Sequence, residues 1–347
     1  MRSRAGFRCG ETVAYRRRVP ANPLLELPDM GNDLLRVEDE LLAAVQTTDA
    51  LLTEMASHLI RAGGKRQRPA FAVAAGACAA GEPGPVPRDV VLGGVSVELV
   101  HLGSLYHDDV IDEAVTRRTV ESVNARWGNL RAILAGDFLL AKASEIAASL
   151  GTEVAGLLAA TIGRLCEGEV RELEAAYDVN RTEDAYLLSI DGKTASLFSA
   201  AARIGGIVAG LPREHIDALT TFGTAYGTAF QIVDDILDVV ATDEQLGKPA
   251  GHDLVEGVYS LPVLRALAGP EGDELRTLLG KPIEGADVER ARQLVQQGSA
   301  VDEAIDEARG WCGRAVASVA DFADRPGAVA LVGVADHLTD ALVALRS

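Results

Sequence analysis

The sequence predicts an all-α protein that forms one domain. Hydrophobic residues make up 48% of its 347 residues and aromatic residues only 4%. The apolar share is rich in alanine and leucine, which favours packed helices over sheets. Apolar residues recur at helical intervals, and no stretch alternates apolar and polar residues as a half-buried strand would. No repeat with a period of about 20–50 residues is present, so a solenoid is not expected.

The first 30 residues differ from the rest of the chain. They contain several arginines (Arg2, Arg4, Arg8, Arg16, Arg17 and Arg18) with no apolar segment behind them, so they are not a secretory signal. We predict that residues 1–30 form a flexible basic arm and that residues 31–347 form the folded domain. Met30 is a possible natural start.

The first half of the domain contains three predicted helices. Apolar side chains recur at helical spacing from residue 32 to 60, and Gly63 and Gly64 end that helix. A second helix begins at Pro69. A third, long helix covers residues 89–112.

Two loops interrupt the later helices, at residues 116–128 and 247–251. The predicted helices around them cover residues 130–150, 153–177, a segment running through 193–206, and a helix from Pro212 through 238. Shorter amphipathic helices follow at about 284–298, 301–323 and 327–345.

Two acidic pentads, residues 108–112 and 234–238, both read Asp-Asp-x-x-Asp within apolar sequence. The first and last aspartates of each pentad are stacked neighbours on a helix, where like charges repel. Near an apolar core such carboxylates either take up protons or are neutralised by a cation. Carboxylate oxygens suit a hard divalent ion, Mg²⁺ or Ca²⁺.

Cationic residues lie at loops or element edges around the pentads. They are Lys65, Arg66, Arg68, Arg117, Arg118, Lys193 and Lys248. Each could be a solvated surface charge, but beside metal-binding acids they predict a ligand with several phosphate groups. No GxxxxGK[ST] or GxGxxG motif is present. His101 lies on about the same helix face as Asp108, and both a ligand-binding and a structural role remain open.

Charge and cysteine content limit the other function classes. The net charge of −18 argues against general nucleic-acid binding. The sequence contains no run of eighteen apolar residues, so it predicts no membrane span. The cysteines are Cys9, Cys78, Cys166 and Cys312. They show no metal spacing, so free thiols in a reducing compartment, and hence a cytoplasmic location, are expected.

At this point the chain resembles the trans-isoprenyl diphosphate synthases (polyprenyl synthetases) over roughly residues 32–347. The matching stretches are 63–69, 101–112, Arg117-Arg118, Gly136-Asp137, Lys193-Thr194, 230–238, Gly247-Lys248-Pro249 and Asp253-Leu254. The resemblance implies the isoprenoid synthase type of fold, one large helical bundle around a central cavity. It also implies chain elongation with isopentenyl diphosphate and an allylic diphosphate as substrates, and Mg²⁺ as cofactor, with three ions when substrate is bound.

The resemblance assigns roles by position. The expected metal ligands are Asp108, Asp112, Asp234 and Asp238. The further residues expected in catalysis are Asp109, Asp235 and Lys193. The residues that match the isopentenyl diphosphate site are Lys65, Arg68, His101 and Arg118, and Arg66 is also expected to bind substrate. The residues that match the allylic diphosphate site are Arg117, Lys193, Thr194, Gln231 and Lys248.

Two positions depart from the family pattern. Val258 stands where many members carry a lysine after Asp253, so one diphosphate contact is missing or supplied elsewhere. Glu169 stands where glutamine is common and adds acid near the cavity.

Product length is predicted from the residues before the first pentad, which in this family form the floor of the cavity. Gly103 and Ser104 are both small, and alanines and a serine follow over 130–150. A deep tunnel and a long-chain product (heptaprenyl or longer), of the kind used for quinone side chains, are expected. A geranylgeranyl product is the alternative.

Three other kinds of protein fit the sequence less well. A class I terpene cyclase normally has a different second metal motif and no isopentenyl diphosphate site. A non-catalytic partner subunit typically loses its acidic motifs, and a plain acidic or Ca²⁺-binding helical protein would not explain the cations. The resemblance also implies a homodimer, and a long product implies transient membrane contact at its release.

Overall fold

The computed structural model describes residues 22–80, 84–246 and 249–346. The first elements in chain order are η1 (Pro23–Glu26), α1 (Met30–Ala44), α2 (Ala50–Arg61), α3 (Gln67–Ala77), α4 (Arg88–Ile111), β1 (Thr116–Arg117), β2 (Val120–Glu121), α5 (Val123–Trp127), α6 (Asn129–Ser149) and α7 (Thr152–Glu174). They are followed by α8 (Glu183–Ile190), η2 (Asp191–Ala195), α9 (Ser196–Val208), α10 (Arg213–Val240), α11 (Asp243–Leu246), α12 (His252–Glu256) and α13 (Leu261–Ala268). The last are α14 (Gly272–Leu278), α15 (Ala286–Gln297), α16 (Ala300–Ser318), η3 (Ala320–Phe322) and α17 (Pro326–Arg346).

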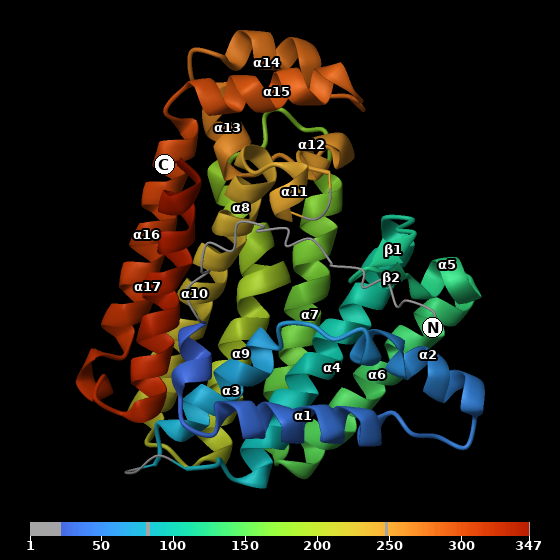
Figure 1. The fold of residues 1–347 in the computed structure, drawn as a ribbon, viewed down its shortest axis with the longest axis vertical. Coiled ribbons are helices and arrows are strands. Elements are labelled where there is room, and N and C mark those ends of the chain that lie inside the picture. The colour runs from blue at the N-terminus through green and yellow to red at the C-terminus, as the bar shows by residue number, and fades with distance from the viewer. Residues whose placement is uncertain (1–21, 81–83, 247–248, 347) are drawn as a thin grey trace, which may run out of the picture.

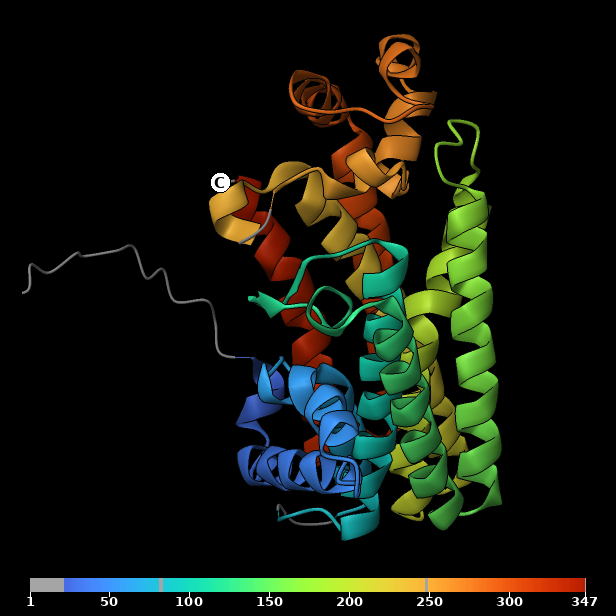
Figure 2. The same ribbon diagram turned by 90° about the vertical axis from the view of Figure 1, so that its right-hand side faces the viewer.

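The long helices stand side by side and form an elongated bundle (Figure 1). Helix α4 lies near its centre and packs mainly against α6, α3 and α9, while α7 contacts α6 and α9, and α10 contacts α9. Helices α16 and α17 flank α10, and α14 and α15 close one end of the bundle. Figure 2 shows α1 and α2 packed across the other end. The predicted all-α fold is confirmed.

The interior holds two apolar clusters that α10 and α16 join. Phe222 and Tyr226 of α10 belong to the larger cluster, which α3, α4, α6 and α9 complete. Ile232 and Ile236, farther along α10, belong to the smaller cluster with α13 and α15. Because the same two helices contribute to both cores, the two ends of the bundle are joined through continuous helices.

The helix predicted over residues 32–60 is in fact two helices. Asp49 caps the second one, because its side chain accepts a hydrogen bond from the Leu52 N–H at 3.0 Å. The Thr53 hydroxyl binds the Thr47 N–H at 3.0 Å and holds the intervening turn. Apolar periodicity carries across such a short break, whereas the capping residues mark it.

The loop predicted over 116–128 contains a small antiparallel hairpin in which β1 pairs with β2. Arg118 and Thr119 both have positive φ, 52° and 66°, which is the turn geometry that matches strand twist in two-residue hairpins. This strand pair is too short to give an alternating sequence pattern.

The boundary predicted at residue 30 is wrong for residues 22–30. Leu24 and Met30 are fully buried, and η1 packs against α17. Two apolar side chains thus fix this segment to the bundle, and the rest of the predicted basic arm, residues 1–21, lies outside the described residues.

Helix α4 has the length and composition of a membrane span, with a mean hydropathy of 1.2, but 72% of that stretch is buried inside the protein. A helix at the centre of a water-facing bundle is apolar all round for the same reason as a membrane helix. Its position in the core therefore accounts for its hydropathy.

The contact between α4 and α6 depends on two glycines that face each other. A Cβ added at Gly103 would lie 3.1 Å from the Gly136 carbonyl oxygen and 3.2 Å from Leu140 Cγ. A Cβ added at Gly136 would lie 3.1 Å from the Gly103 carbonyl oxygen. The two helix backbones therefore approach closely at this crossing.

We expect Gly103→Ala to lower the free energy of unfolding by about 1–3 kcal/mol, since the added methyl group overpacks the crossing. Gly163→Ala is the matched control, because nothing lies within 4 Å of a Cβ at Gly163 of α7. The control should gain up to about 1 kcal/mol from helix propensity. Urea unfolding of both variants measures the difference, and equal effects would contradict the assigned contact.

Candidate active site

A cavity of about 490 Å³ opens between α4, α7, η2 and α10. Its apolar wall comes from α4 and α7, and its polar groups come from the two pentads, from η2, from α3 and from these same two helices. The side chains that line it are Arg68, His101, Ser104, Leu105, His107, Asp108, Ile111, Leu165, Cys166, Glu169, Val170, Leu173, Lys193, Thr194, Gln231 and Asp234.

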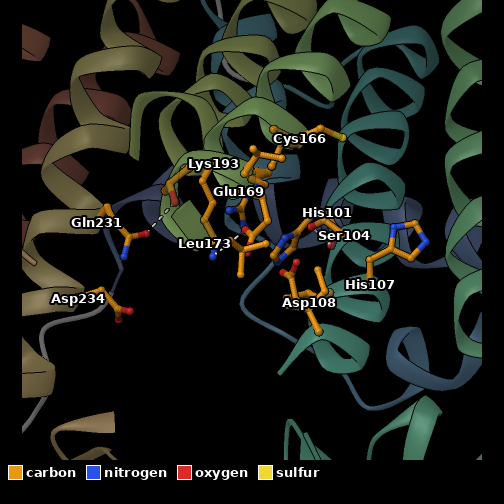
Figure 3. Close-up of a pocket in the computed structure, with 16 residues that line it drawn as sticks. His101, Ser104, His107, Asp108, Cys166, Glu169, Leu173, Lys193, Gln231 and Asp234 are labelled. Atoms are coloured by element: carbon orange, nitrogen blue, oxygen red, sulfur yellow. Dashed lines mark hydrogen bonds and ion pairs between the residues drawn. The ribbon is translucent and has the colours of Figure 1, made fainter. Parts of the chain in front are cut away.

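The first aspartates of the two pentads face this cavity from opposite sides. Asp108 lies one turn before the end of α4, and Asp234 lies on α10. Figure 3 shows Lys193 and Glu169 between them. Asp112 is the C-cap of α4 and is exposed beside the cavity mouth. The structure thus brings together acids that are over 120 positions apart in the sequence.

Electrostatics at the first pentad favour a bound cation. Burial raises the pKa of Asp108 to about 7, and the nearby carboxylates of Glu169 and Asp112 add to the effect, against the opposing charge of Lys193. Asp112 is exposed at the helix end, but the surrounding protein still desolvates it in part and raises its pKa, with Glu256 contributing. A divalent ion would relieve this repulsion, and an all-oxygen donor set suits Mg²⁺ or Ca²⁺. The residues present therefore fit the metal that the sequence predicts.

No three His, Cys, Asp or Glu side chains within the described residues are grouped tightly enough to hold a metal ion by themselves. The acids from α4 and from α10 stand apart, so ions between them would need further oxygen ligands. Diphosphate oxygens and water are the ligands that Mg²⁺ commonly takes in addition to one or two carboxylates.

Lys193 is held between two carboxylates of α7. Its Nζ lies 2.8 Å from Glu169 Oε2, and it also donates to Glu172. Burial alone would lower the pKa of Lys193, but these two carboxylates outweigh it and raise the pKa. An ammonium group has three N–H donors, so one donor remains for a ligand in the cavity. Glu169, which stands where the family commonly has glutamine, is therefore an ion-pair partner of Lys193.

The wide turn η2 carries Lys193 and Thr194 toward the cavity. This turn is π-helical, and it packs closely on α7: a Cβ at Gly168 would lie 2.4 Å from the Lys193 backbone nitrogen. Only a glycine at 168 allows this approach, which explains the Glu-Gly-Glu sequence there.

The second aspartate of each pentad turns away from the cavity. Asp109 is fully buried, and its Oδ1 accepts a hydrogen bond from Arg117 Nε at 2.6 Å. Asp235 accepts from the Tyr186 hydroxyl at 2.5 Å and from Gln231 Nε2 at 2.8 Å. Both residues support the site from behind rather than facing the ligand space.

The expectation that Asp238 binds metal is not supported by its position. Asp238 is buried, does not line the cavity, and accepts the Asp253 N–H at 3.1 Å. Stacking on Asp234 along the helix predicted a shared ion, but in the structure a backbone N–H of α12, that of Asp253, uses the Asp238 carboxylate.

Arg68 and His101, which were predicted to bind isopentenyl diphosphate, both line the cavity. Arg68 Nε is buried and has no hydrogen-bond partner among the residues described, and its guanidinium lies 4.9 Å from the Phe198 ring centre. Burial, together with the charges of Arg68 and Arg118, holds the pKa of His101 well below its usual value. This end of the cavity therefore offers an uncharged imidazole and a guanidinium with an unused donor.

The prediction that Arg66 binds substrate is wrong. Arg66 is 5% exposed, and its donors bind Glu38, Glu98 and the backbone carbonyls of Gly63 and Ile60. Because all five N–H groups of a guanidinium are engaged, Arg66 anchors the loop between α2 and α3. The sequence Lys65-Arg66-Gln67-Arg68 alone does not indicate which of these cationic side chains is buried in the protein.

The remaining predicted cations lie in different settings. Arg118 is half-buried and donates to the Leu59 carbonyl at 3.2 Å and to the Gly63 carbonyl, with its NH2 4.0 Å from the Glu98 carboxylate. Lys65 is exposed on the loop before α3 and does not line the cavity. Lys248 lies outside the described residues.

Gly103 and Ser104, both predicted at the cavity floor, point in different directions. Ser104 lines the cavity. Gly103 does not, because it is the contact point between α4 and α6. The expectation that Gly103 forms the floor of this cavity is therefore corrected, and Ser104 remains.

Three residues at the site were missed from the sequence. Glu172 could have been found, because it lies three positions after Glu169 on the same helix face. Tyr186 and Glu98 carry no motif, and only the packing of α8 and α4 shows their contacts with Asp235 and Arg66.

Comparisons with known proteins identify the family of this chain. A family model described as Polyprenyl synthetase matches residues 49–297. A nonaprenyl diphosphate synthase from Mycobacterium tuberculosis is 39% identical over 305 residues, covering 87% of this chain and 90% of that protein. A heptaprenyl diphosphate synthase component 2 from Geobacillus stearothermophilus is 38% identical over 274 residues, covering 79% of this chain and 84% of that protein.

A solved structure is also similar over nearly the whole fold. The crystal structure of polyprenyl synthase from Caulobacter crescentus, complexed with calcium and isoprenyl diphosphate, superposes with a TM-score of 0.85 at 34% identity. The match covers 94% of this chain and 99% of that one.

Proposed function

The chain belongs to the polyprenyl synthetase family of prenyltransferases, and we propose that it condenses isopentenyl diphosphate head to tail onto an allylic diphosphate. The observation that carries this proposal is the pair of acids, Asp108 and Asp234, facing across one cavity that also contains Lys193 and an apolar wall. Acids and a cation suit a metal-bound diphosphate, and the apolar wall suits a hydrocarbon tail.

We propose that Asp108, Asp112 and Asp234 hold Mg²⁺ together with the allylic diphosphate. When bound, the metal would neutralise the diphosphate and stabilise charge on the departing pyrophosphate. The calcium and isoprenyl diphosphate in the Caulobacter crescentus structure support divalent binding in this fold. The raised pKa of Asp108 supports it from the chain itself.

The protein's own side chains supply the rest of the proposed mechanism. Lys193, with Thr194 and Gln231 beside it, orients the allylic diphosphate, while Arg68 and His101 bind isopentenyl diphosphate. Ionisation gives an allylic cation, the double bond of isopentenyl diphosphate attacks it, and a proton then leaves to the departing pyrophosphate. The apolar wall from α4 and α7 excludes water, which would otherwise capture the cation.

A long-chain product, heptaprenyl or longer, is the favoured outcome. The two curated relatives are named as nonaprenyl and heptaprenyl synthases, and Ser104 places only a small side chain one turn before Asp108. A geranylgeranyl product is therefore not favoured.

The direct test incubates the protein with farnesyl diphosphate, excess isopentenyl diphosphate and Mg²⁺, and sizes the dephosphorylated products. We expect alcohols of seven or more isoprene units, and no product after chelation of the metal. Exclusively twenty-carbon or shorter alcohols would contradict the long-chain assignment. Pyrophosphate release without any elongation would point instead to a cyclase.

Ser104→Phe should shorten the product, because the aromatic ring would enter the cavity wall below Asp108. The chain-length distribution on thin-layer chromatography measures the change. Ser104→Ala is the control and should leave the distribution unchanged, since it adds no volume. Products of unchanged length from Ser104→Phe would place the limiting residue elsewhere.

We also propose that two copies of the chain associate through α6. Leu130, Ile133 and Leu134 lie at i, i+3 and i+4 on this helix and are 80%, 39% and 63% exposed. A contiguous apolar face of this kind is typical of a protein interface. The name of the heptaprenyl synthase component 2 raises a different partner subunit as the alternative.

Leu134→Arg should convert the dimer to a monomer, because a charge would be buried at the interface. Sedimentation velocity measures the mass. Leu35→Arg is the matched control, since Leu35 of α1 is 64% exposed but lies away from α6. A wild-type protein that sediments as a monomer would contradict the homodimer and favour a separate partner.

Free thiols at Cys78, Cys166 and Cys312 support the proposal that the protein works in the reducing cytoplasm. We also propose that the protein contacts a membrane transiently when it releases its long polyprenyl product.

A further inference from the structure

A chain of hydrogen bonds runs behind the second pentad, away from the cavity. The Thr194 hydroxyl donates to Gln231 Oε1 at 2.7 Å, and Gln231 Nε2 donates to Asp235 Oδ1 at 2.8 Å. The Tyr186 hydroxyl donates to Asp235 Oδ2 at 2.5 Å. The first two residues line the cavity, whereas Tyr186 and Asp235 are buried behind it, 2% and 5% exposed.

The order of donors in this chain gives the Gln231 amide one orientation. In its ionised form the Asp235 carboxylate accepts hydrogen bonds and does not donate, and Gln231 accordingly turns its NH₂ group toward Asp235. The Gln231 oxygen then faces Thr194, whose hydroxyl donates to it. Without Asp235, the hydroxyl of Thr194 could accept as well as donate, and either amide orientation would satisfy it.

Tyr186 in turn fixes Asp235. The two Asp235 oxygens accept from groups on different elements, Tyr186 of α8 and Gln231 of α10. The carboxylate therefore cannot rotate into the cavity without losing both bonds. The Arg181 guanidinium lies 5.5 Å from the Tyr186 ring centre and donates to the Ser189 hydroxyl at 2.8 Å.

The Gln231 NH₂ group has two N–H donors, and Asp235 uses one of them. Because Gln231 lines the cavity next to Asp234, the second donor is available to a ligand there. Figure 3 shows the Gln231 amide beside the cavity, on the same side as Asp234.

We propose that Tyr186 and Asp235 are positioning residues that lock the Gln231 amide so that it presents its second N–H to the allylic diphosphate. This inference rests on the proposed function, because it assigns the allylic diphosphate to this side of the cavity. It separates the roles of two adjacent aspartates: Asp234 faces the ligand, and Asp235 orients a neighbour.

The test compares Tyr186→Phe with Tyr259→Phe by steady-state kinetics. Tyr259 is the matched control: it is also a fully buried tyrosine with a hydrogen-bonded hydroxyl, which accepts the Gly280 N–H at 2.7 Å. We expect Tyr186→Phe to raise the KM for the allylic diphosphate about tenfold, by analogy with the roughly 10–100-fold losses seen when the hydrogen-bond partners of metal ligands are removed. Its KM for isopentenyl diphosphate should stay the same, and the control should change neither.

A double-mutant cycle separates positioning from general loss of packing. In a Gln231→Ala background, Tyr186→Phe should raise the allylic KM no further, because the group it positions is gone. Additive effects of the two substitutions would overturn the inference. Equal allylic KM values for Tyr186→Phe and wild type would overturn it as well.

Asp235→Asn serves as a second probe if Tyr186→Phe lowers stability, which thermal unfolding would report. The amide of asparagine can donate or accept, so the Gln231 orientation is no longer fixed and the allylic KM should rise again; an unchanged value would overturn the inference. The wild-type assay distinguishes failure of the proposed function from failure of the positioning role. Absence of any condensation would refute the proposed function, whereas normal wild-type condensation with unaltered variants would refute only the positioning role.

Discussion

The desolvation of Asp108 is the constraint on which the rest of the site depends. A carboxylate in an apolar wall is unstable as an anion unless charge of the opposite sign lies nearby. The fold offers Lys193 as a partial counter-charge, but Lys193 is itself held by two glutamates of α7. The unliganded cavity therefore carries an excess of negative charge near its mouth. This negative charge favours the binding of a divalent cation, whose remaining positive charge can in turn bind phosphate oxygens.

Several helices supply the apolar and the polar parts of this site. Helices α4 and α7 supply the apolar wall, while α10 and η2 supply polar groups, and the close crossing of α4 on α6 keeps the first pentad in place. Residues that look equivalent in the pentads have separate tasks because each helix has one side toward the cavity and one toward its neighbours. Asp108 and Asp234 face the ligand space, whereas Asp109 and Asp235 bond to Arg117 and Tyr186.

Much of this was predictable from the sequence, and the misses have a common cause. Helical periodicity located the long helices, and the two pentads with the surrounding cations identified the chemistry of the ligand. Side-chain direction was harder to predict. Arg66 turns inward, Gly103 meets α6 and Asp238 is covered by the loop after it, since each depends on a neighbouring element that spacing along one helix does not describe. The break at Asp49 was missed because periodicity continued across it.

The π-helical turn at η2 has a consequence for how the chain can vary in length. Such a turn holds one more residue than an α-helical turn over the same path, so it is equivalent to a single-residue insertion that the helix has absorbed. Deleting any one residue of 191–195 would return the segment to α-helical winding. The helices on either side would keep their relative orientation, whereas the residues within the turn would each shift by one position along the helix. Lys193 would then lose its alignment with Glu169, so this short stretch should tolerate changes of side chain better than changes of length.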